Sequence, residues 1–87
     1  MAREYCFPAL LSFGYEGGRL WVANFVGLHG CWVEGEERDD VIARASPVLS
    51  EYLRCCDEAG ITIPEAPDAD ELRLLNIGEV LQVRAVI

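Results

Sequence analysis

The sequence has few basic residues and no long apolar run. Arginine and lysine together number 7 against 15 aspartate and glutamate residues, which gives the 87-residue chain a formal net charge of -8. A field of that sign repels the phosphate backbone, so we expect no direct binding of RNA or DNA. No stretch approaches the roughly 18 apolar residues of a membrane span, and the N-terminus lacks the pattern of a secretion signal. We therefore predict a cytoplasmic protein that makes no membrane contact.

Residues with catalytic or metal-binding chemistry are also scarce. His29 is the single histidine and lies between glycines, without a serine or cysteine nearby in a recognisable nucleophile motif. Cys31 is two residues away, and Cys55 and Cys56 are adjacent, whereas structural zinc sites use CxxC-like pairs. We predict no catalytic residues, no metal and no cofactor. In a reducing compartment the four cysteines should be free thiols.

The chain has enough hydrocarbon to fold by itself. Apolar residues make up 52% of it, which excludes intrinsic disorder, and its length is typical of one domain, residues 1–87. Three short segments, residues 5–12, 20–25 and 31–35, are rich in aromatic and aliphatic residues and are separated by glycines. This pattern predicts a meander of three antiparallel strands, with its first reversal at residues 13–19. Pro8 cannot donate to a ladder, so we expect it at an edge or a bulge.

After the third segment, the spacing of the apolar residues changes to that of an amphipathic helix, which ends at Gly60. The apolar positions are Val41, Ile42, Ala45, Val48, Leu49, Tyr52, Leu53, Cys56 and Ala59. Acidic residues at 36, 37, 39 and 40 suit the positive end of the helix dipole. Pro47 inside the helix costs about 3 kcal/mol, and Ser46 with Pro47 offers the alternative start of a second helix. Because the apolar stripe stays in phase across Pro47, we favour one kinked helix.

The remaining residues, 61–87, have the pattern of a connector, a short helical turn and a last strand. Residues 61–70 contain Pro64 and Pro67, and Asp68 and Glu71 are spaced as a capping box before a turn at residues 72–75. Residues 79–87 alternate as a fourth strand, so the predicted fold is α+β in the order β-β-β-α-β.

The predicted sheet has apolar residues on both faces. Adjacent apolar pairs such as Leu10 with Leu11, and Trp21 with Val22, must point to opposite faces, whereas one long helix covers only one of them. The second face must be buried by the tail or by another chain. We favour self-association, as a homodimer or a higher homo-oligomer.

The order of elements resembles that of the HicB-type antitoxin family. The residues that carry the resemblance are Phe7-Pro8-Ala9, Gly17-Gly18, Phe25, Leu28, Gly30, Cys31, Gly35, Ala45, Leu49, Tyr52, Leu53, Gly60 and Ile63-Pro64, with the valine-rich last strand. The chain departs from the family at Val26, Gly27 and His29, where Pro, Asp and Pro are usual, and at Pro47. The resemblance implies a shortened ribonuclease H-like fold that neutralises HicA, a small basic RNA-cleaving toxin. It also implies that this chain, which stops at the fourth strand without a DNA-binding domain, does not repress transcription alone.

Protein binding is the function that these observations favour. The candidate surface is the exposed third strand with the acidic stretch beside it, namely Trp32, Glu34, Glu36, Glu37, Asp39 and Asp40. Trp21 and Trp32 are equally good candidates for core or interface. Residues 5–12 lack the carboxylate with which ribonuclease H sites begin, so nuclease activity is not expected. Two functions remain, a neutraliser of a basic HicA-like toxin and an orphan HicB-like homo-oligomer with another partner.

Overall fold

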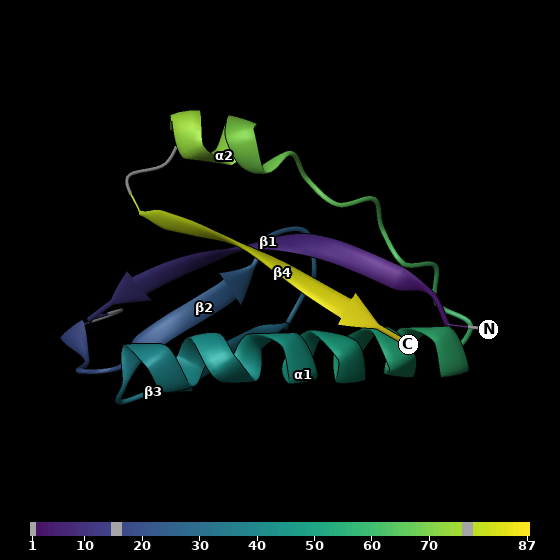
Figure 1. The fold of residues 1–87 in the computed structure, drawn as a ribbon, viewed down its shortest axis with the longest axis horizontal. Helices are drawn as coiled ribbons and strands as arrows, with labels where there is room; N and C mark the ends of the chain where they lie inside the picture. The colour runs from purple at the N-terminus through teal and green to yellow at the C-terminus, as the bar shows by residue number, and fades with distance from the viewer. Residues whose placement is uncertain (1, 15–16, 76–77) are drawn as a thin grey trace.

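The computed structural model describes residues 2–14, 17–75 and 78–87, and in these residues four strands form one antiparallel sheet in the order β3-β2-β1-β4. The elements are β1 (Glu4–Phe13), β2 (Trp21–Phe25), β3 (Trp32–Gly35), α1 (Arg38–Glu58), α2 (Ala69–Leu75) and β4 (Glu79–Val86). Helix α1 lies along one face of the sheet and α2 lies on the other side (Figure 1). The predicted α+β fold is confirmed, with α2 as a short addition before β4. Tyr15 and Glu16 of the predicted first reversal lie outside the described residues.

The core lies between α1 and the sheet, where one row of alternate β1 side chains points at the helix. Phe7, Ala9 and Leu11 are buried against α1, and each is paired with residues of β4 or β2 that point the same way, such as Val83 opposite Phe7 and Phe25 opposite Ala9. A strand with period two presents one such row to a covering helix. The row and the helix therefore form one continuous core.

The prediction that Pro8 marks an edge or a bulge is wrong. Strand β1 is central, and its register with β4 runs without interruption from Glu4 to Leu11. Its pairing with β2 begins at the residue after Pro8, and the backbone N–H of Val26, just past the end of β2, donates to the Pro8 carbonyl at 3.2 Å. The donor that proline lacks thus falls where the ladder with β2 ends, so the sheet loses little.

Helix α1 runs continuously through Pro47, so the alternative of two separate helices is wrong. Its buried residues, Val41, Ala45, Leu49 and Leu53, form one stripe against the sheet. Pro47 is on the exposed side, where water can bind the carbonyl that loses its helical partner.

The ends of α1 differ slightly from the prediction. The helix begins one residue after Glu37, so Glu36 and Glu37 precede its first turn, which holds Asp39 and Asp40. At the other end Gly60 has a φ of 72°, and the next backbone N–H donates to the Cys56 carbonyl at 2.9 Å. This left-handed residue ends the helix as predicted.

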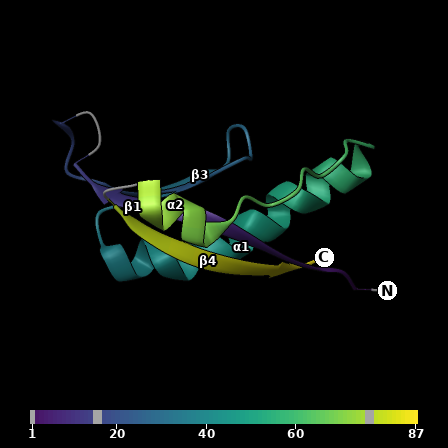
Figure 2. The same cartoon turned by 90° about the horizontal axis from the view of Figure 1, so that it is seen from above.

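The chain's own tail covers part of the second face of the sheet. The connector after α1 crosses to that face and leads into α2, which packs on β4 (Figure 2). Ala69 of α2 and Val80 of β4 are buried, at 6% and 9% exposure, and Pro67 packs so closely on Gly27 that a Cβ there would lie 3.2 Å from its ring. The predicted capping of this turn by Asp68 is present, since its Oδ1 accepts the Asp70 N–H at 2.8 Å. Self-association is therefore not needed to cover this region.

The two ends of the described chain lie side by side. Arg3 and Ile87 exchange backbone hydrogen bonds of 2.8 and 3.0 Å, which extends the β1–β4 ladder to its last residue. Of the helices in the described part of the chain, neither is both long and apolar enough to cross a membrane.

Candidate protein-binding surface

Strand β3 forms one edge of the sheet and presents two of the predicted binding residues on the same face. Val33 is buried against α1, so its neighbours Trp32 and Glu34 point to the opposite face. They lie beside Asn24 and Val22 of β2 respectively. The Trp32 ring is 53% exposed, although tryptophan is usually well buried. An aromatic ring and a carboxylate thus stand side by side on an open edge.

The acidic stretch divides into paired and unpaired carboxylates. Asp40 forms an ion pair of 3.0 Å with Arg44, and Asp39 lies 3.8 Å from Arg38. Within the described residues no arginine lies in ion-pair distance of the carboxylates of Glu34, Glu36 and Glu37, and all three are exposed. Negative potential therefore concentrates at the junction of β3 and α1. We call Trp32, Glu34, Glu36 and Glu37 the β3 patch.

Arg44 holds this edge against α1. Its Nη2 donates to the Glu34 backbone carbonyl at 2.7 Å, while its Nε donates to Asp40 Oδ2 at 3.1 Å. The absence of a side chain at Gly35 makes space for the Arg44 guanidinium, because a Cβ at residue 35 would lie 2.5 Å from Arg44 Nη2. The spacing of Asp40 and Arg44 is visible in the sequence as a helical i,i+4 pair. The contact with the strand was missed because it depends on how α1 packs on β3.

The two tryptophans have different roles. Trp21 faces α1 and is half-buried, with its ring centroid 5.0 Å from that of Phe13 and the Arg38 guanidinium 5.9 Å from the ring. Such contacts anchor it to the core. Trp32 is exposed and free to contact a partner. The structure therefore distinguishes two tryptophans that the sequence could not.

In the part of the chain that the structure describes, the residues with metal-binding or nucleophilic chemistry are not assembled into a site. His29 lies in the exposed loop between β2 and β3, and its backbone carbonyl accepts the Tyr52 hydroxyl at 2.8 Å. Among the residues that the structure describes, no three histidine, cysteine or carboxylate side chains gather as metal ligands would. Cys31 is buried, whereas Cys6 and Cys55 are exposed, and all are free thiols.

Burial raises the pKa of the Cys31 thiol to about 11, with a smaller contribution from Cys56. In the unfolded chain the group has its ordinary value of 9.0, so between about pH 9 and 11 the folded protein holds a proton that the unfolded chain releases. The contribution of Cys31 to folding stability is complete below pH 9 and should fall as the pH rises to 11.

The burial of Cys31 and the exposure of Cys6 and Cys55 predict that alkylation will be selective among the thiols. At pH 8 iodoacetamide should modify Cys6 and Cys55 and leave Cys31 untouched until the chain is unfolded, because the thiolate is the nucleophile. Peptide mass spectrometry after timed alkylation measures this. Modification of Cys31 in the folded chain at the rate of Cys55 would contradict it.

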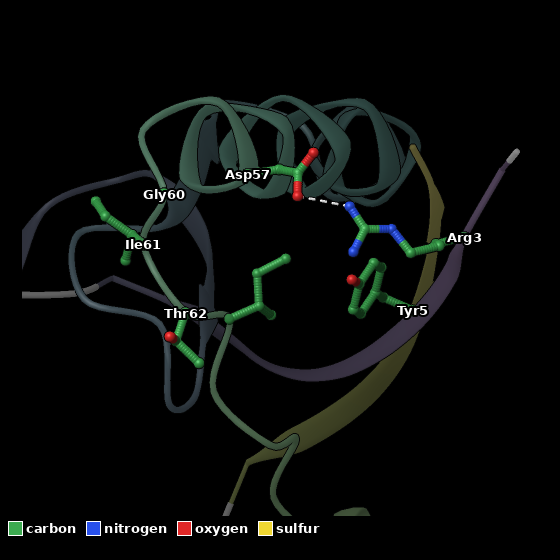
Figure 3. Close-up of a pocket in the computed structure, with 7 residues that line it drawn as sticks. Arg3, Tyr5, Asp57, Gly60, Ile61 and Thr62 are labelled. Carbon is green, nitrogen blue, oxygen red and sulfur yellow. Dashed lines mark hydrogen bonds and ion pairs between the residues drawn. The ribbon is translucent and has the colours of Figure 1, made fainter.

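An open depression of about 420 Å³ lies where the start of β1 meets the end of α1. Arg3 and Asp57 meet there in an ion pair of 2.6 Å, with Tyr5 beside Arg3 (Figure 3). The two charges neutralise each other, and the lining residues include no histidine or cysteine. The geometry ties the N-terminal strand to the helix and presents no nucleophile with an adjacent base.

Comparison with known proteins yields one structural likeness. No family model and no curated protein matches the sequence. Among solved structures, the chain is similar to one from a "HicA3 and HicB3 toxin-antitoxin complex", with a TM-score of 0.68 and 18% sequence identity. The match covers 93% of this chain and 98% of that chain. At this identity the likeness shows a shared fold along almost the whole of both chains.

Proposed function

We propose that this chain is an antitoxin-like protein that binds and neutralises a small basic HicA-type toxin, a ribonuclease that cleaves mRNA. The observation that carries the proposal is the β3 patch, where an exposed tryptophan adjoins three carboxylates without an ion pair among the described residues. The likeness in fold to a chain of a HicA3 and HicB3 complex supports the choice of system.

The charge of the chain favours the antitoxin role over the toxin role. A protein that cleaves RNA must attract phosphates, whereas this chain carries a net charge of -8. An acidic antitoxin and a basic toxin attract each other at long range.

Neutralisation would follow from occupation of the toxin's RNA-binding surface. The carboxylates of Glu34, Glu36 and Glu37 are placed to meet arginine and lysine side chains that otherwise bind phosphate. Trp32 is placed to supply the apolar anchor, since buried aromatic residues carry much of the energy of protein interfaces. Bound in this way, the chain competes with RNA and needs no chemistry of its own.

We infer that the chain is not an enzyme. The only carboxylate of β1 is Glu4, and it is bound to Arg84, with Arg84 Nε donating to Glu4 Oε1 at 2.8 Å. A ribonuclease H-type centre needs clustered carboxylates that remain free to hold metal ions. The fold resemblance is thus compatible with a binding function alone.

The proposal is tested with the product of a small basic reading frame, carrying one catalytic histidine, that neighbours this gene. The two proteins should co-purify, and this chain should protect RNA from cleavage by the purified toxin. Serum albumin at equal concentration serves as the control. Cleavage that continues in excess chain would remove the antitoxin proposal.

A further inference from the structure

Strand β4 forms the second edge of the sheet and is regular along its whole length. Arg3 and Ile87 exchange both backbone hydrogen bonds, and antiparallel ladders alternate between bonded and non-bonded pairs. The backbone groups of every second residue of β4 therefore point away from β1. With the register as observed, these residues are Val80, Gln82, Arg84 and Val86.

A groove runs between this edge and α1. It has a volume of about 370 Å³ and mostly apolar walls, with Ile42 and Ser46 on the helix side and residues 81–84 on the strand side. Ser46 Oγ donates to the Arg84 carbonyl at 2.6 Å, so the helix reaches the edge at one point without covering it. Natural edge strands are usually protected by proline, lysine or a bulge. Strand β4 contains no proline, lysine or bulge, so its protection is limited to the charge of Arg84 and the Ser46 hydrogen bond to the Arg84 carbonyl.

The charges near β4 indicate what kind of chain fits there. Arg84 is paired with Glu4, and Arg38 with Glu79, so both charged residues of β4 have an ion-pair partner. The β3 edge, by contrast, carries the unpaired carboxylates of the β3 patch. A basic partner thus has its electrostatic preference at β3, whereas a second copy of this acidic chain meets unpaired carboxylates at β3 and only paired charges on strand β4 itself.

We propose that two copies of this chain associate through their β4 edges, antiparallel, with the two-fold axis at Gln82. An axis at Arg84 would place the two guanidinium groups directly opposite each other. An axis at Val83 would make the two Arg84 side chains diagonal neighbours across the paired strands, which still brings like charges close together. With the axis at Gln82, each Arg84 lies opposite Val80 of the copy. The backbone groups of Gln82 then bond to those of its counterpart.

The resulting dimer has one continuous sheet in the order β3-β2-β1-β4-β4-β1-β2-β3. An axis perpendicular to the sheet puts both α1 helices on the same face, and the apolar groove of each copy is closed by Leu81 and Val83 of the other. The two β3 patches lie at the outer ends and stay open. This inference does not rest on the proposed function, because a dimer through β4 is expected whether or not a toxin exists.

The test uses opposite charges at the axis. Gln82 is exposed, so Gln82→Glu and Gln82→Lys should both fold, and in each variant two like charges would face each other across the axis. We expect each variant alone to dimerise about fivefold more weakly than the unmodified chain. An equimolar mixture of the two should form a heterodimer at least as stable as the unmodified dimer, measured by sedimentation equilibrium and native mass spectrometry.

Asn24 supplies the matched control. It is an exposed amide on the same face of the sheet but on the inner strand β2, so Asn24→Glu and Asn24→Lys should leave dimerisation unchanged. The proposal is overturned by an unmodified chain that stays monomeric up to its solubility limit. It is also overturned if the Gln82 mixture shows no preference for the heterodimer, or if the Asn24 variants weaken the dimer equally. Toxin binding by the unmodified chain is measured separately and decides neither outcome.

Discussion

Replacing Glu34, Glu36 and Glu37 together with lysine should slow association with a basic HicA-type toxin by about tenfold or more at low ionic strength. These carboxylates are exposed and have no ion-pair partner among the described residues, so their field acts on the approaching partner instead of on a neighbouring arginine. The remaining association should also depend less on salt concentration. Stopped-flow or surface plasmon resonance measurements over a series of salt concentrations give both quantities.

Glu58, Glu65 and Glu71 offer a control with the same change in net charge. They are exposed, lie outside the β3 patch and form none of the ion pairs found in the described residues. Their replacement by lysine should slow association much less. Equal slowing by both triple variants would mean that net charge alone matters and would contradict the assignment of the patch. Folding should change by less than about 1 kcal/mol, because Glu37 precedes α1 without a side-chain capping bond.

Replacing Trp32 with alanine should weaken toxin binding by about thirtyfold or more, which corresponds to about 2 kcal/mol. The ring is 53% exposed in the free chain and would be desolvated in a complex, where it contributes apolar area with little conformational entropy to lose. The change should appear mainly as faster dissociation, since the anchor acts after encounter. Surface plasmon resonance measures this rate, and urea unfolding of the free chain should show little change.

Phe13 is the matched aromatic control for Trp32. Its ring is 57% exposed, but it packs against Trp21 on the face that carries α1, away from Trp32. Phe13→Ala should leave the dissociation rate of the complex unchanged. A Trp32→Ala variant that binds as tightly as the unmodified chain, or a Phe13→Ala variant that loses as much affinity, would place the binding surface elsewhere.

Local periodicity was sufficient to predict most of the fold. Strands with alternating apolar residues and a helix with an apolar stripe in phase across Pro47 have the predicted order, because burial of such stripes dominates helix and sheet formation. Pro8 was misjudged because a proline in a central strand is tolerated where a neighbouring strand ends. Where β2 ends relative to β1 is a property of the register, which the local sequence does not reveal.

The candidate site could be predicted only in part. The acidic stretch is evident from sequence, but which carboxylates are unpaired depends on where the arginines fall in three dimensions, as the pairing of Arg44 with Asp40 illustrates. Trp21 and Trp32 have similar sequence contexts and are separated only by the face of the sheet to which each points. The sequence named the tail and another chain as alternative covers of the second face, and it could not decide between them because α2 offers one buried alanine and little periodicity.

We assign different binding partners to the two edges of the sheet. The β3 edge carries unpaired negative charge and an exposed ring, which suit a basic partner, whereas the charged residues of β4 are paired and the strand is regular, which suits a second copy. Helix α1 donates one side-chain hydrogen bond to an outward-pointing backbone carbonyl on each edge. Arg44 donates to the Glu34 carbonyl of β3, and Ser46 donates to the Arg84 carbonyl of β4. The helix therefore positions the two edges that we assign to binding.

Neutralisation of the toxin is tested by titrating a purified HicA-type toxin with this chain and following cleavage of an mRNA substrate. Because each copy has one β3 patch, cleavage should fall linearly and stop near one chain per toxin, and the Trp32→Ala variant should require a clear excess. Cleavage that proceeds at its original rate in a large excess of the unmodified chain would show that the chain does not neutralise the toxin.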